Sequence, residues 1–333
     1  MSMISKTGFA IATLLVAGLF AGSEIEAAKA NMTIAAGGKG SGGYRLSGGL
    51  AEAVNRVSDK VNMTVQPTGG FVANTRIIGT GRTQFAMSST VFLDFIRRQK
   101  GPFKKNKEKV LSIRAIGPVA TSWFQLVVPS KSKIKSYNDM LGKRVNLGKK
   151  GSGGYFMANN IVNWMGIKKK IQADAMSWGP ATRALVDGKI DVFMIHNPVP
   201  SPHVLRASRS INVRVLDMPE SLRDKFEELS PGYSRETVDA SVYKGMKGKK
   251  FKSISHSVFL VAHKGTPNDI VYEVTRHTYT EKSKKFLTSG HKAWKFGLRD
   301  AATSGAFIKK VMKTGTPMHP GAMRFWKEKG YSN

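Results

Sequence analysis

The sequence of 333 residues contains no cysteine. This absence excludes disulfide scaffolds, thiolate zinc sites, iron–sulfur clusters and cysteine nucleophiles together. It also excludes lipid attachment through an N-terminal cysteine. After residue 30, no stretch approaches the roughly 20 consecutive apolar residues that a membrane-spanning helix needs. We therefore expect residues 31–333 to fold outside the membrane, without metal–thiolate chemistry.

Acidic residues are scarce: 22 Asp and Glu stand against 53 Lys and Arg, a formal net charge of +31. A basic excess of this size first suggests a nucleic-acid partner. The excess is spread over the whole chain, however, whereas nucleic-acid binders concentrate it in a tail, a stripe or a recognition helix. The hydrophobic fraction of 41% is enough for a folded core. We expect no nucleic-acid partner.

The first thirty residues have the pattern of a secretory signal peptide. Lys6 precedes an uncharged apolar run at Gly8–Gly22, and Ala28-Lys29-Ala30 has the small-x-small pattern of a cleavage site. The run is shorter than a membrane span. The pattern predicts export to the periplasm and cleavage after Ala30. An uncleaved N-terminal anchor is the alternative.

From residue 31, short apolar strands alternate with helical patterns, which is typical of an α/β fold with parallel strands. The predicted strands are Met32–Ala36, Asn62–Gln66, Gln84–Met87, Phe124–Val128, Arg144–Leu147, Ile171–Met176, Asp191–Ile195 and Val258–Ala262. The predicted helices are Leu46–Val57, Val72–Thr80, Thr90–Gln99, Ser136–Met140, Tyr155–Met165, Ala181–Val186, Asp269–Leu287 and Leu298–Thr314, followed by a tail. We expect one lobe from residues 31–118, a second from 119–255, and a return to the first lobe over 256–333. Two such lobes favour a hinged clamshell that closes on a ligand.

Glycine-rich loops follow one predicted strand in each lobe, at Gly37–Gly43 and Gly148–Gly154. The first contains a GxGxxG pattern, but the next strand ends in Gln66-Pro67-Thr68 and lacks the acidic residue that holds a ribose. No phosphate-binding P-loop motif occurs, and we expect no cofactor. Loops of this kind present backbone N–H groups at a helix N-terminus, where they can bind an anion. Ordinary strand-to-helix connections are the alternative.

Metal and catalytic motifs are not evident in the sequence. The seven histidines show no metal-ligand spacing, and no Gly-x-Ser-x-Gly motif is present. A secreted hydrolase or transferase would need a nucleophile and a base, which these motifs do not supply. His196 follows a predicted strand, so it can belong either to a site or to a structural loop. Four tryptophans are expected in the core: Trp123, Trp164, Trp178 and Trp294.

Four segments, residues 315–330, 187–193, 149–154 and 68–74, together resemble one known family, the TAXI solute receptors that serve TRAP transporters. The tail Gly315–Gly330 follows the family's PLHPGA-x-R ending, and Asp187–Phe193 resembles its DGKIDAFF stretch. Lys149–Gly154 is similar to its PPGSG loop, and Thr68-Gly69-Gly70 with Asn74 to its TGGSxxN pattern. The resemblance implies a periplasmic-binding-protein clamshell, type II-like, in which each lobe is a sheet flanked by helices.

This resemblance also implies a function and a set of site residues. The implied protein is a monomeric periplasmic receptor, not an enzyme, that captures glutamate or another small anionic solute by lobe closure. It would deliver the solute to the large and small, or fused, TRAP membrane subunits. The ligand-binding residues it implies are Ser41, Gly42, Tyr44, Thr68, Gly70, Phe71, Ser88, Ser89, Ser152, Gly153, Tyr155, His196 and Asn197.

The chain departs from the family pattern at positions near the expected site. Phe71 stands where the family has serine, Ser89 replaces a frequent glutamine, and Arg45 is an added cation. The first glycine-rich loop also lacks one threonine and one tyrosine of the family. We therefore expect an anionic, partly apolar organic acid. The alternatives are a receptor for an ABC-type importer and a cationic envelope-associated protein without a transport role.

Overall fold

The computed structural model describes residues 28–106 and 110–331. The expected signal peptide therefore lies outside the described residues, except for its last three. Ala30, which precedes the expected cleavage point, is the first residue of strand β1 and pairs with Val61. Across the described residues, no helix combines the length and the apolar character needed to cross a membrane.

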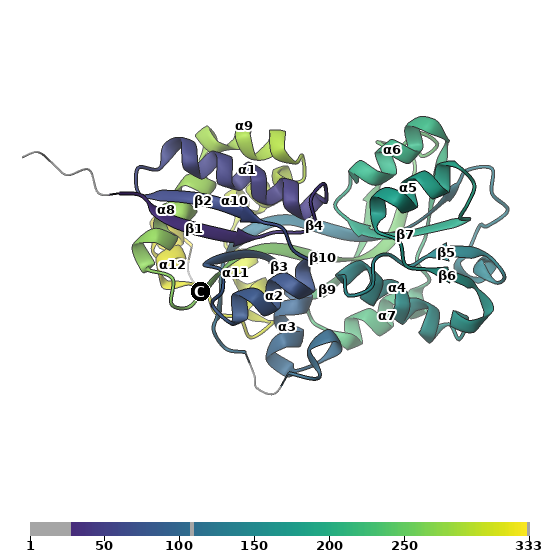
Figure 1. Cartoon of the computed structure of the whole chain (residues 1–333), viewed down its shortest axis with the longest axis horizontal. Helices are drawn as coiled ribbons and strands as arrows, with labels where there is room; N and C mark the ends of the chain where they lie inside the picture. The colour runs from purple at the N-terminus through teal and green to yellow at the C-terminus, as the bar shows by residue number, and fades with distance from the viewer. Residues whose placement is uncertain (1–27, 107–109, 332–333) are drawn as a thin grey trace, which may run out of the picture.

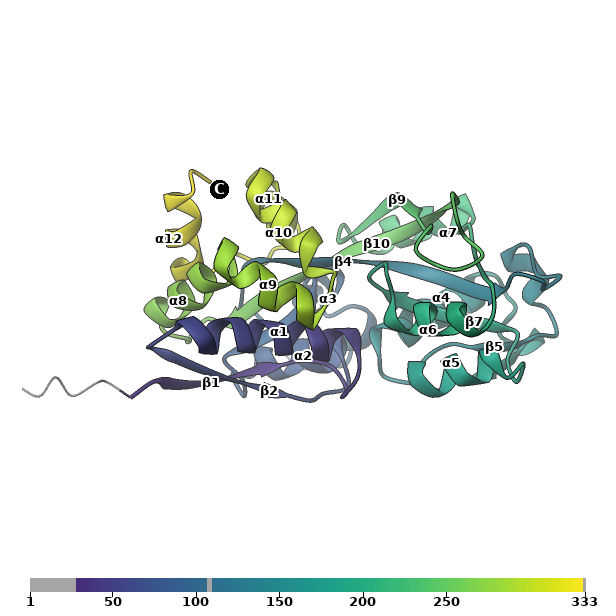
Figure 2. The same ribbon diagram turned by 90° about the horizontal axis from the view of Figure 1, so that it is seen from above.

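A single ten-stranded sheet extends along the described chain (Figures 1 and 2). Its main path runs β2-β1-β3-β10-β4-β7-β5-β6, while β8 pairs with β4 and β9 with β10. The strands are β1 (Ala30–Ala35), β2 (Val61–Gln66), β3 (Phe85–Ser89), β4 (Ile113–Pro129), β5 (Arg144–Asn146), β6 (Gln172–Asp174), β7 (Val192–Asn197), β8 (Val213–Leu216), β9 (Tyr233–Asp239) and β10 (Lys250–His263). Parallel pairs lie toward the two ends of the path, and antiparallel pairs join them in the middle.

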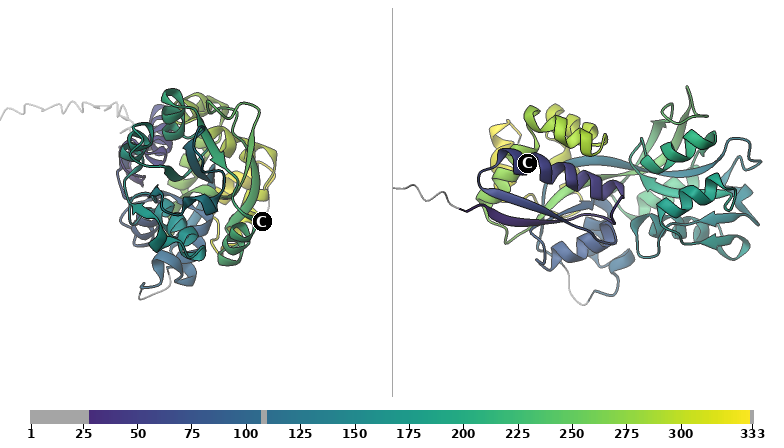
Figure 3. Two further views of the ribbon diagram at one scale, coloured as in Figure 1. Left: turned by 90° about the vertical axis from the view of Figure 1, so that its right-hand side faces the viewer. Right: turned by 45° about the horizontal axis from the view of Figure 1, so that its top comes forward.

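Helices flank this sheet in two lobes (Figure 3). We call β1–β3 with α1–α3 and α8–α12 the first lobe, and β5–β9 with α4–α7 the second lobe. The helices are α1 (Gly42–Val57), α2 (Phe71–Gly79), α3 (Thr90–Arg98), α4 (Gly153–Trp164), α5 (Trp178–Val186), α6 (Pro202–Ser210), α7 (Glu220–Leu229), α8 (Asn268–Thr278), α9 (Glu281–Gly290), α10 (Trp294–Thr303), α11 (Ala306–Met312) and α12 (Pro320–Glu328). Short 3₁₀ turns lie at Gly101–Phe103, Tyr137–Met140 and Lys168–Lys170. The predicted two-lobed α/β clamshell is confirmed.

The two lobes repeat one chain path. In the first lobe, β1 lies between β2 and β3, and helices α1 and α2 connect these three parallel strands in sequence. In the second lobe, β5 lies between β6 and β7, and α4 and α5 make the corresponding connections. Because the strands of each set are parallel, the loops that leave their carboxyl ends gather at one edge of each lobe.

Two long antiparallel strands, β4 and β10, pass through both lobes. The expected boundaries at residues 118 and 255 fall inside these two strands. The sequence predicts only the C-terminal part of each strand, Phe124–Val128 and Val258–Ala262. In the sheet, the pairing of β10 with β4 shifts register on both sides of Phe259 and Leu260, which lie opposite Pro118 and Gly117. Such irregularities let a proline sit within a sheet.

The C-terminal helices pack on the first lobe. Trp294 Nε1 donates to the Leu46 carbonyl oxygen of α1 at 3.0 Å, and Trp326 Nε1 donates to the Ile116 carbonyl oxygen of β4 at 2.7 Å. The tail expected after residue 314 is wrong in one respect, because it contains helix α12, capped by the His319 side chain. Each of the two long helices expected in this region is divided, at Tyr279-Thr280 and at Ser304-Gly305. Tyr279 ends α8 and donates its hydroxyl to the Pro118 carbonyl oxygen.

Candidate functional site

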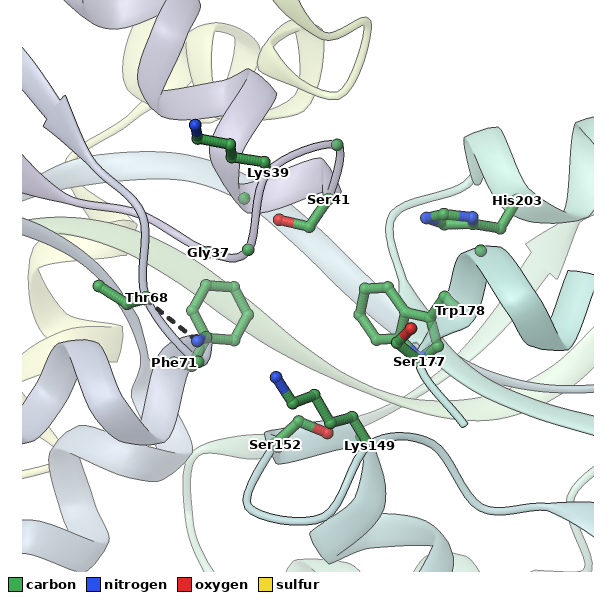
Figure 4. A pocket seen from close by; sticks show the side chains of 18 of the residues that line it. Gly37, Lys39, Ser41, Thr68, Phe71, Lys149, Ser152, Ser177, Trp178 and His203 are labelled. Atoms are coloured by element: carbon green, nitrogen blue, oxygen red, sulfur yellow. Dashed lines mark hydrogen bonds between the residues drawn. The ribbon is translucent and has the colours of Figure 1, made fainter. Parts of the chain in front are cut away.

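A cavity of about 490 Å³ lies between the two lobes (Figure 4). Its volume is within the range of small-molecule sites. The loops after β1 and β2 supply one wall, and the loops after β5 and β6, with the end of β7 and the start of α6, supply the other. The first lobe contributes Ala36, Gly37, Gly38, Lys39, Gly40, Ser41, Gly43, Arg45, Thr68, Gly69, Gly70 and Phe71. The second contributes Lys149, Ser152, Gly153, Gly154, Ser177, Trp178, Gly179, Pro180, His196, His203 and Arg206.

One glycine-rich loop from each lobe reaches this cavity with the same local conformation. The segments Lys39–Tyr44 and Lys150–Tyr155 both read KGSGGY. The first glycine of each has a left-handed backbone, with φ of 81° at Gly40 and 82° at Gly151, which glycine adopts without steric cost. Each loop therefore turns sharply into its helix.

The serine of each loop caps the helix that follows. Ser41 Oγ accepts from the Tyr44 N–H, and Ser152 Oγ accepts from the Tyr155 N–H, both at 3.2 Å. The two glycines between serine and tyrosine lie in the first helical turn, where the backbone N–H groups have no intrahelical acceptor. Three of these four glycines line the cavity. Their N–H groups and the helix dipole favour an anion there.

A hydrogen-bond network fixes the second loop of the first lobe. Thr68 Oγ1 donates to the Ala36 carbonyl oxygen at 2.7 Å and accepts from the Gly70 N–H at 3.1 Å. It also contacts the side chain of Asn74, whose Nδ2 donates to the Met87 carbonyl oxygen. Gly70 has φ of 107°, a conformation available to glycine alone. This geometry places Phe71 at the first residue of α2, against the cavity.

The charged side chains that line the cavity are all basic: Lys39, Arg45, Lys149 and Arg206. No carboxylate lies among the described lining residues. Each lobe supplies two of the four cations. The cavity wall is therefore electrostatically suited to an anion.

The two lining histidines are neutral at physiological pH. Burial lowers the pKa of His196 to about 3. Burial, and then the charges of Arg206 and Arg45, lower the pKa of His203 to about 4. Their side chains are only 5% and 7% exposed, and His196 Nε2 and His203 Nδ1 have no hydrogen-bond partner among the described residues. Each histidine can offer a neutral donor or acceptor to a ligand.

A further histidine, His256, packs against His196 on the side away from the cavity lining. The His196 and His256 rings stack at 4.1 Å between centroids, and His196 Nδ1 and His256 Nε2 are 3.1 Å apart. Strand β4 separates their strands β7 and β10 in the sheet. The pair therefore links His196, which lines the cavity, to β10, one of the two strands that pass through both lobes.

Seven of the thirteen residues expected at the site line the cavity: Ser41, Thr68, Gly70, Phe71, Ser152, Gly153 and His196. Two others, Gly42 and Asn197, meet at the lobe interface beside it. A Cβ added at Gly42 would lie 2.9 Å from Asn197 Oδ1. Tyr44 and Tyr155 take part in the loops through their capped N–H groups and are not among the lining residues.

The two serines at the end of β3 do not reach the cavity. Ser88 and Ser89 are fully buried. The Ser88 hydroxyl hydrogen-bonds to Thr75 Oγ1 at 2.7 Å, and the Ser89 hydroxyl caps α3 by accepting from the Phe92 N–H. The equivalent strand of the second lobe, β7, does bring His196 to the cavity. The two lobes therefore differ at this position.

Several lining residues were not expected from the sequence. Trp178 was expected in the core, but it is half-buried and lines the cavity as the first residue of α5. His203 and Arg206 lie on α6, which follows Pro198 and Pro200 and begins with Pro202. The place of Trp178 in the short loop after a parallel strand is the signal that could have identified it.

No group of three or more potential metal ligands occurs among the residues that the structure describes. Likewise, within the described chain no serine hydroxyl of the cavity wall hydrogen-bonds to a histidine side chain. The wall offers backbone N–H groups, cations, hydroxyls, two imidazoles and the rings of Phe71 and Trp178.

Comparison with known proteins gives a family match and distant structural likenesses. A family model described as the NMT1-like family matches residues 34–330. Similar solved structures include the alkanesulfonate-binding protein SsuA from Xanthomonas axonopodis pv. citri bound to MOPS, with 16% identity, coverage of 90% of this chain and 83% of that chain, and a TM-score of 0.42. A putative L-cystine ABC transporter from Listeria monocytogenes has 14% identity, coverage of 81% and 97%, and a TM-score of 0.47. The GluR0 ligand-binding core from Nostoc punctiforme in complex with L-glutamate has 12% identity, coverage of 79% and 98%, and a TM-score of 0.45.

Proposed function

This chain belongs to the NMT1-like family, and we propose that it is a receptor that binds a small anionic organic solute between its lobes. One observation carries the proposal. The cavity between the lobes is lined by four basic side chains, two from each lobe, and by no carboxylate among the described lining residues. Catalysis is not part of the proposal.

Binding would follow from the two glycine-rich loops. The first-turn N–H groups of α1 and α4 converge on the cavity from opposite lobes, so one anionic group can accept hydrogen bonds while the basic side chains balance its charge. Because each lobe holds half of the contacts, the solute binds most tightly when the lobes are closed on it. Strands β4 and β10 are the hinge in this proposal.

The finer parts of the proposal rest on the resemblance to TAXI receptors. They are export to the periplasm, service to a TRAP-type transporter with large and small or fused membrane subunits, and an organic acid such as glutamate as solute. The division into lobes at residues 118 and 255, and a monomeric state, belong to the same proposal. An ABC-type membrane partner is the competing one.

Lys149 and Lys150 provide a matched test, because Lys149 lines the cavity and Lys150 does not. We expect Lys149→Ala to weaken binding of an organic acid about tenfold or more, since hydrogen bonds to charged groups are worth about 1.5–3 kcal/mol. Lys150→Ala removes the same charge from the adjacent position and should leave affinity nearly unchanged. Titration calorimetry with a panel of carboxylates, sugars and amines measures both variants.

The panel also tests the proposal as a whole. Binding of carboxylates, without binding of neutral sugars or amines, supports it. Binding of sugars or amines alone, or an equal loss of carboxylate affinity in the two lysine variants, would contradict it. Mass spectrometry of the solute released from natively purified protein would then identify the natural ligand.

A further inference from the structure

Two aromatic residues occupy equivalent positions in the two lobes. Phe71 is the first residue of α2, the helix between β2 and β3, and Trp178 is the first residue of α5, the helix between β6 and β7. Both side chains line the cavity. Figure 4 shows their rings on the two sides of the cavity, with Ser41 above and Lys149 and Ser152 below. The repeated chain path thus places one ring on each wall.

Each ring rests on a buried imidazole. The Phe71 ring makes an edge contact with His256 at 5.9 Å between centroids and 76° between planes. The Trp178 ring makes an edge contact with His203 at 5.7 Å and 62°. His256 in turn stacks on His196 at the cavity floor. Both supporting histidines are buried.

Two glycines of the second lobe lie next to the tryptophan ring. A Cβ added at Gly154 would lie 3.4 Å from the Trp178 ring, and one added at Gly148 would lie 3.6 Å from its Nε1. On the opposite wall, the hydrogen bonds of Thr68 to Ala36 and Gly70 fix the turn that precedes Phe71. The turn that carries Phe71 is therefore fixed before any solute binds.

The cavity accordingly combines two aromatic rings with four cations. A small aliphatic acid can use the cations and N–H groups but leaves both rings without a partner. A flat aromatic acid can place its carboxylate at the glycine N–H groups and its ring between Phe71 and Trp178, where aromatic pairs gain stability beyond their buried area. Closing the lobes would bring the two rings toward each other across such a solute.

We propose that Phe71 and Trp178 form an aromatic clamp and that, among organic acids, the solute is a small aromatic carboxylate and not glutamate. This inference rests on the proposed function, since it assumes that an anionic solute binds in this cavity. It makes Phe71 and Trp178 the specificity-determining residues, one from each lobe.

A pair of acids matched in size and charge tests the clamp on the unmodified protein. Benzoate and cyclohexanecarboxylate carry the same anionic group on six-membered carbon rings, and only benzoate is flat and aromatic. We expect benzoate and larger aromatic acids such as indole-3-acetate to bind at least tenfold more tightly than cyclohexanecarboxylate and glutamate. Quenching of Trp178 fluorescence on benzoate binding provides a second readout.

Variants of the two rings test the assignment to residues. Phe71→Leu and Trp178→Leu keep an apolar side chain but remove the ring. Each should reduce the preference for benzoate over cyclohexanecarboxylate about tenfold, with a smaller change in cyclohexanecarboxylate affinity. Phe286→Leu, on α9 away from the cavity, is the matched control and should keep the preference of the unmodified protein.

The outcomes separate this inference from the proposed function. Aliphatic acids that bind as tightly as aromatic acids of the same charge overturn the clamp and leave the anion receptor standing. Binding of neutral solutes alone overturns both. Because the acid pair is compared on the unmodified protein, a variant that fails to fold does not remove the test.

Discussion

The loops Lys39–Tyr44 and Lys150–Tyr155 have the same six residues and the same capped turn, yet they face different neighbours. In the first loop, the lysine itself lines the cavity. In the second, the preceding residue Lys149 takes that place. The residue after the tyrosine is Arg45, a cavity cation, in the first lobe, and Phe156, which packs among aromatic rings, in the second. An identical hexapeptide therefore fixes the turn and the N–H groups, while the flanking residues decide what else each wall offers.

The first glycine of each helix also contacts the opposite lobe. A Cβ at Gly42 would lie 2.9 Å from Asn197 Oδ1 of β7, and a Cβ at Gly153 would lie 2.7 Å from the Phe92 ring of α3. Glycine is needed at both places because the lobes approach closely there. The partners differ, however: one is a terminal amide and the other is a ring wedged against Phe95, Phe103 and Phe156.

Lowering the pH gives the largest expected change in the free energy of unfolding. It tests whether burial lowers the pKa of one histidine in each lobe to the same extent. His203 of the second lobe and His291 of the first lobe both have a pKa lowered to about 4, mainly by burial and partly by cationic neighbours that include Arg45. Below about pH 6.5 the unfolded chain binds protons that the folded chain does not, so the free energy of unfolding decreases as the pH falls toward 4. The slope is up to about 1.4 kcal/mol per pH unit for each histidine.

His203→Gln and His291→Gln should each flatten this slope by the same amount. Urea denaturation at intervals between pH 4.5 and 7 measures it. A slope that only one of the two variants changes would show that the histidines are not equivalent. A slope unchanged in both would contradict the assignment of neutral buried imidazoles.

Replacing Gly42 and Gly153 by alanine should show which of their two contacts with the opposite lobe is the more rigid. Gly153→Ala forces a methyl group against Phe92, whose ring is held by its neighbours, so we expect a loss of about 1–3 kcal/mol in stability and a clear loss of solute affinity. Gly42→Ala should cost less, because the Asn197 amide can rotate away. Thermal unfolding and calorimetric titration of both variants measure the difference.

Gly48 provides the control for these two substitutions. It lies within α1, and a Cβ added there meets no atom within 4 Å. Gly48→Ala should therefore raise stability by about 0.5–1 kcal/mol, since alanine is the better helix former. A larger loss at Gly42 than at Gly153 would reverse the proposed order.

The serine caps should give the smallest and most symmetric effect. Ser41→Ala and Ser152→Ala each remove a 3.2 Å hydrogen bond to a tyrosine N–H, and each should cost about 1 kcal/mol of stability. Denaturant titration without solute compares the two directly. Costs that differ by much more than the error of the measurement would mean that the shared hexapeptide does not behave alike in the two lobes.

Local sequence patterns predict much of the fold and part of the site. The α/β alternation, the strands β1, β2 and β3, and the two glycine-rich loops all follow from residues close together in the chain. Ser41 and Ser152 lie in these loops, just after strand ends, whereas Thr68 and Phe71 were implied by the resemblance to TAXI receptors; all four line the cavity. Ser88 adjoins such an end too, but its hydroxyl is taken by Thr75, a contact that local pattern does not contain.

Neighbouring residues alone specify the repeated unit: a strand, a left-handed glycine, a capping serine and a helix, found once in each lobe. Backbone conformation and capping depend on neighbouring residues, so they can be predicted from the sequence. Which side chains line the cavity depends on contacts far apart in the sequence. Trp178, His203 and Arg206 come to the cavity because β4 and β10 hold two lobes against each other, and a contact between lobes leaves no trace in local periodicity. The same distinction applies to the basic residues. The net charge of +31 follows from the composition, whereas the fold brings four of the cations to one cavity.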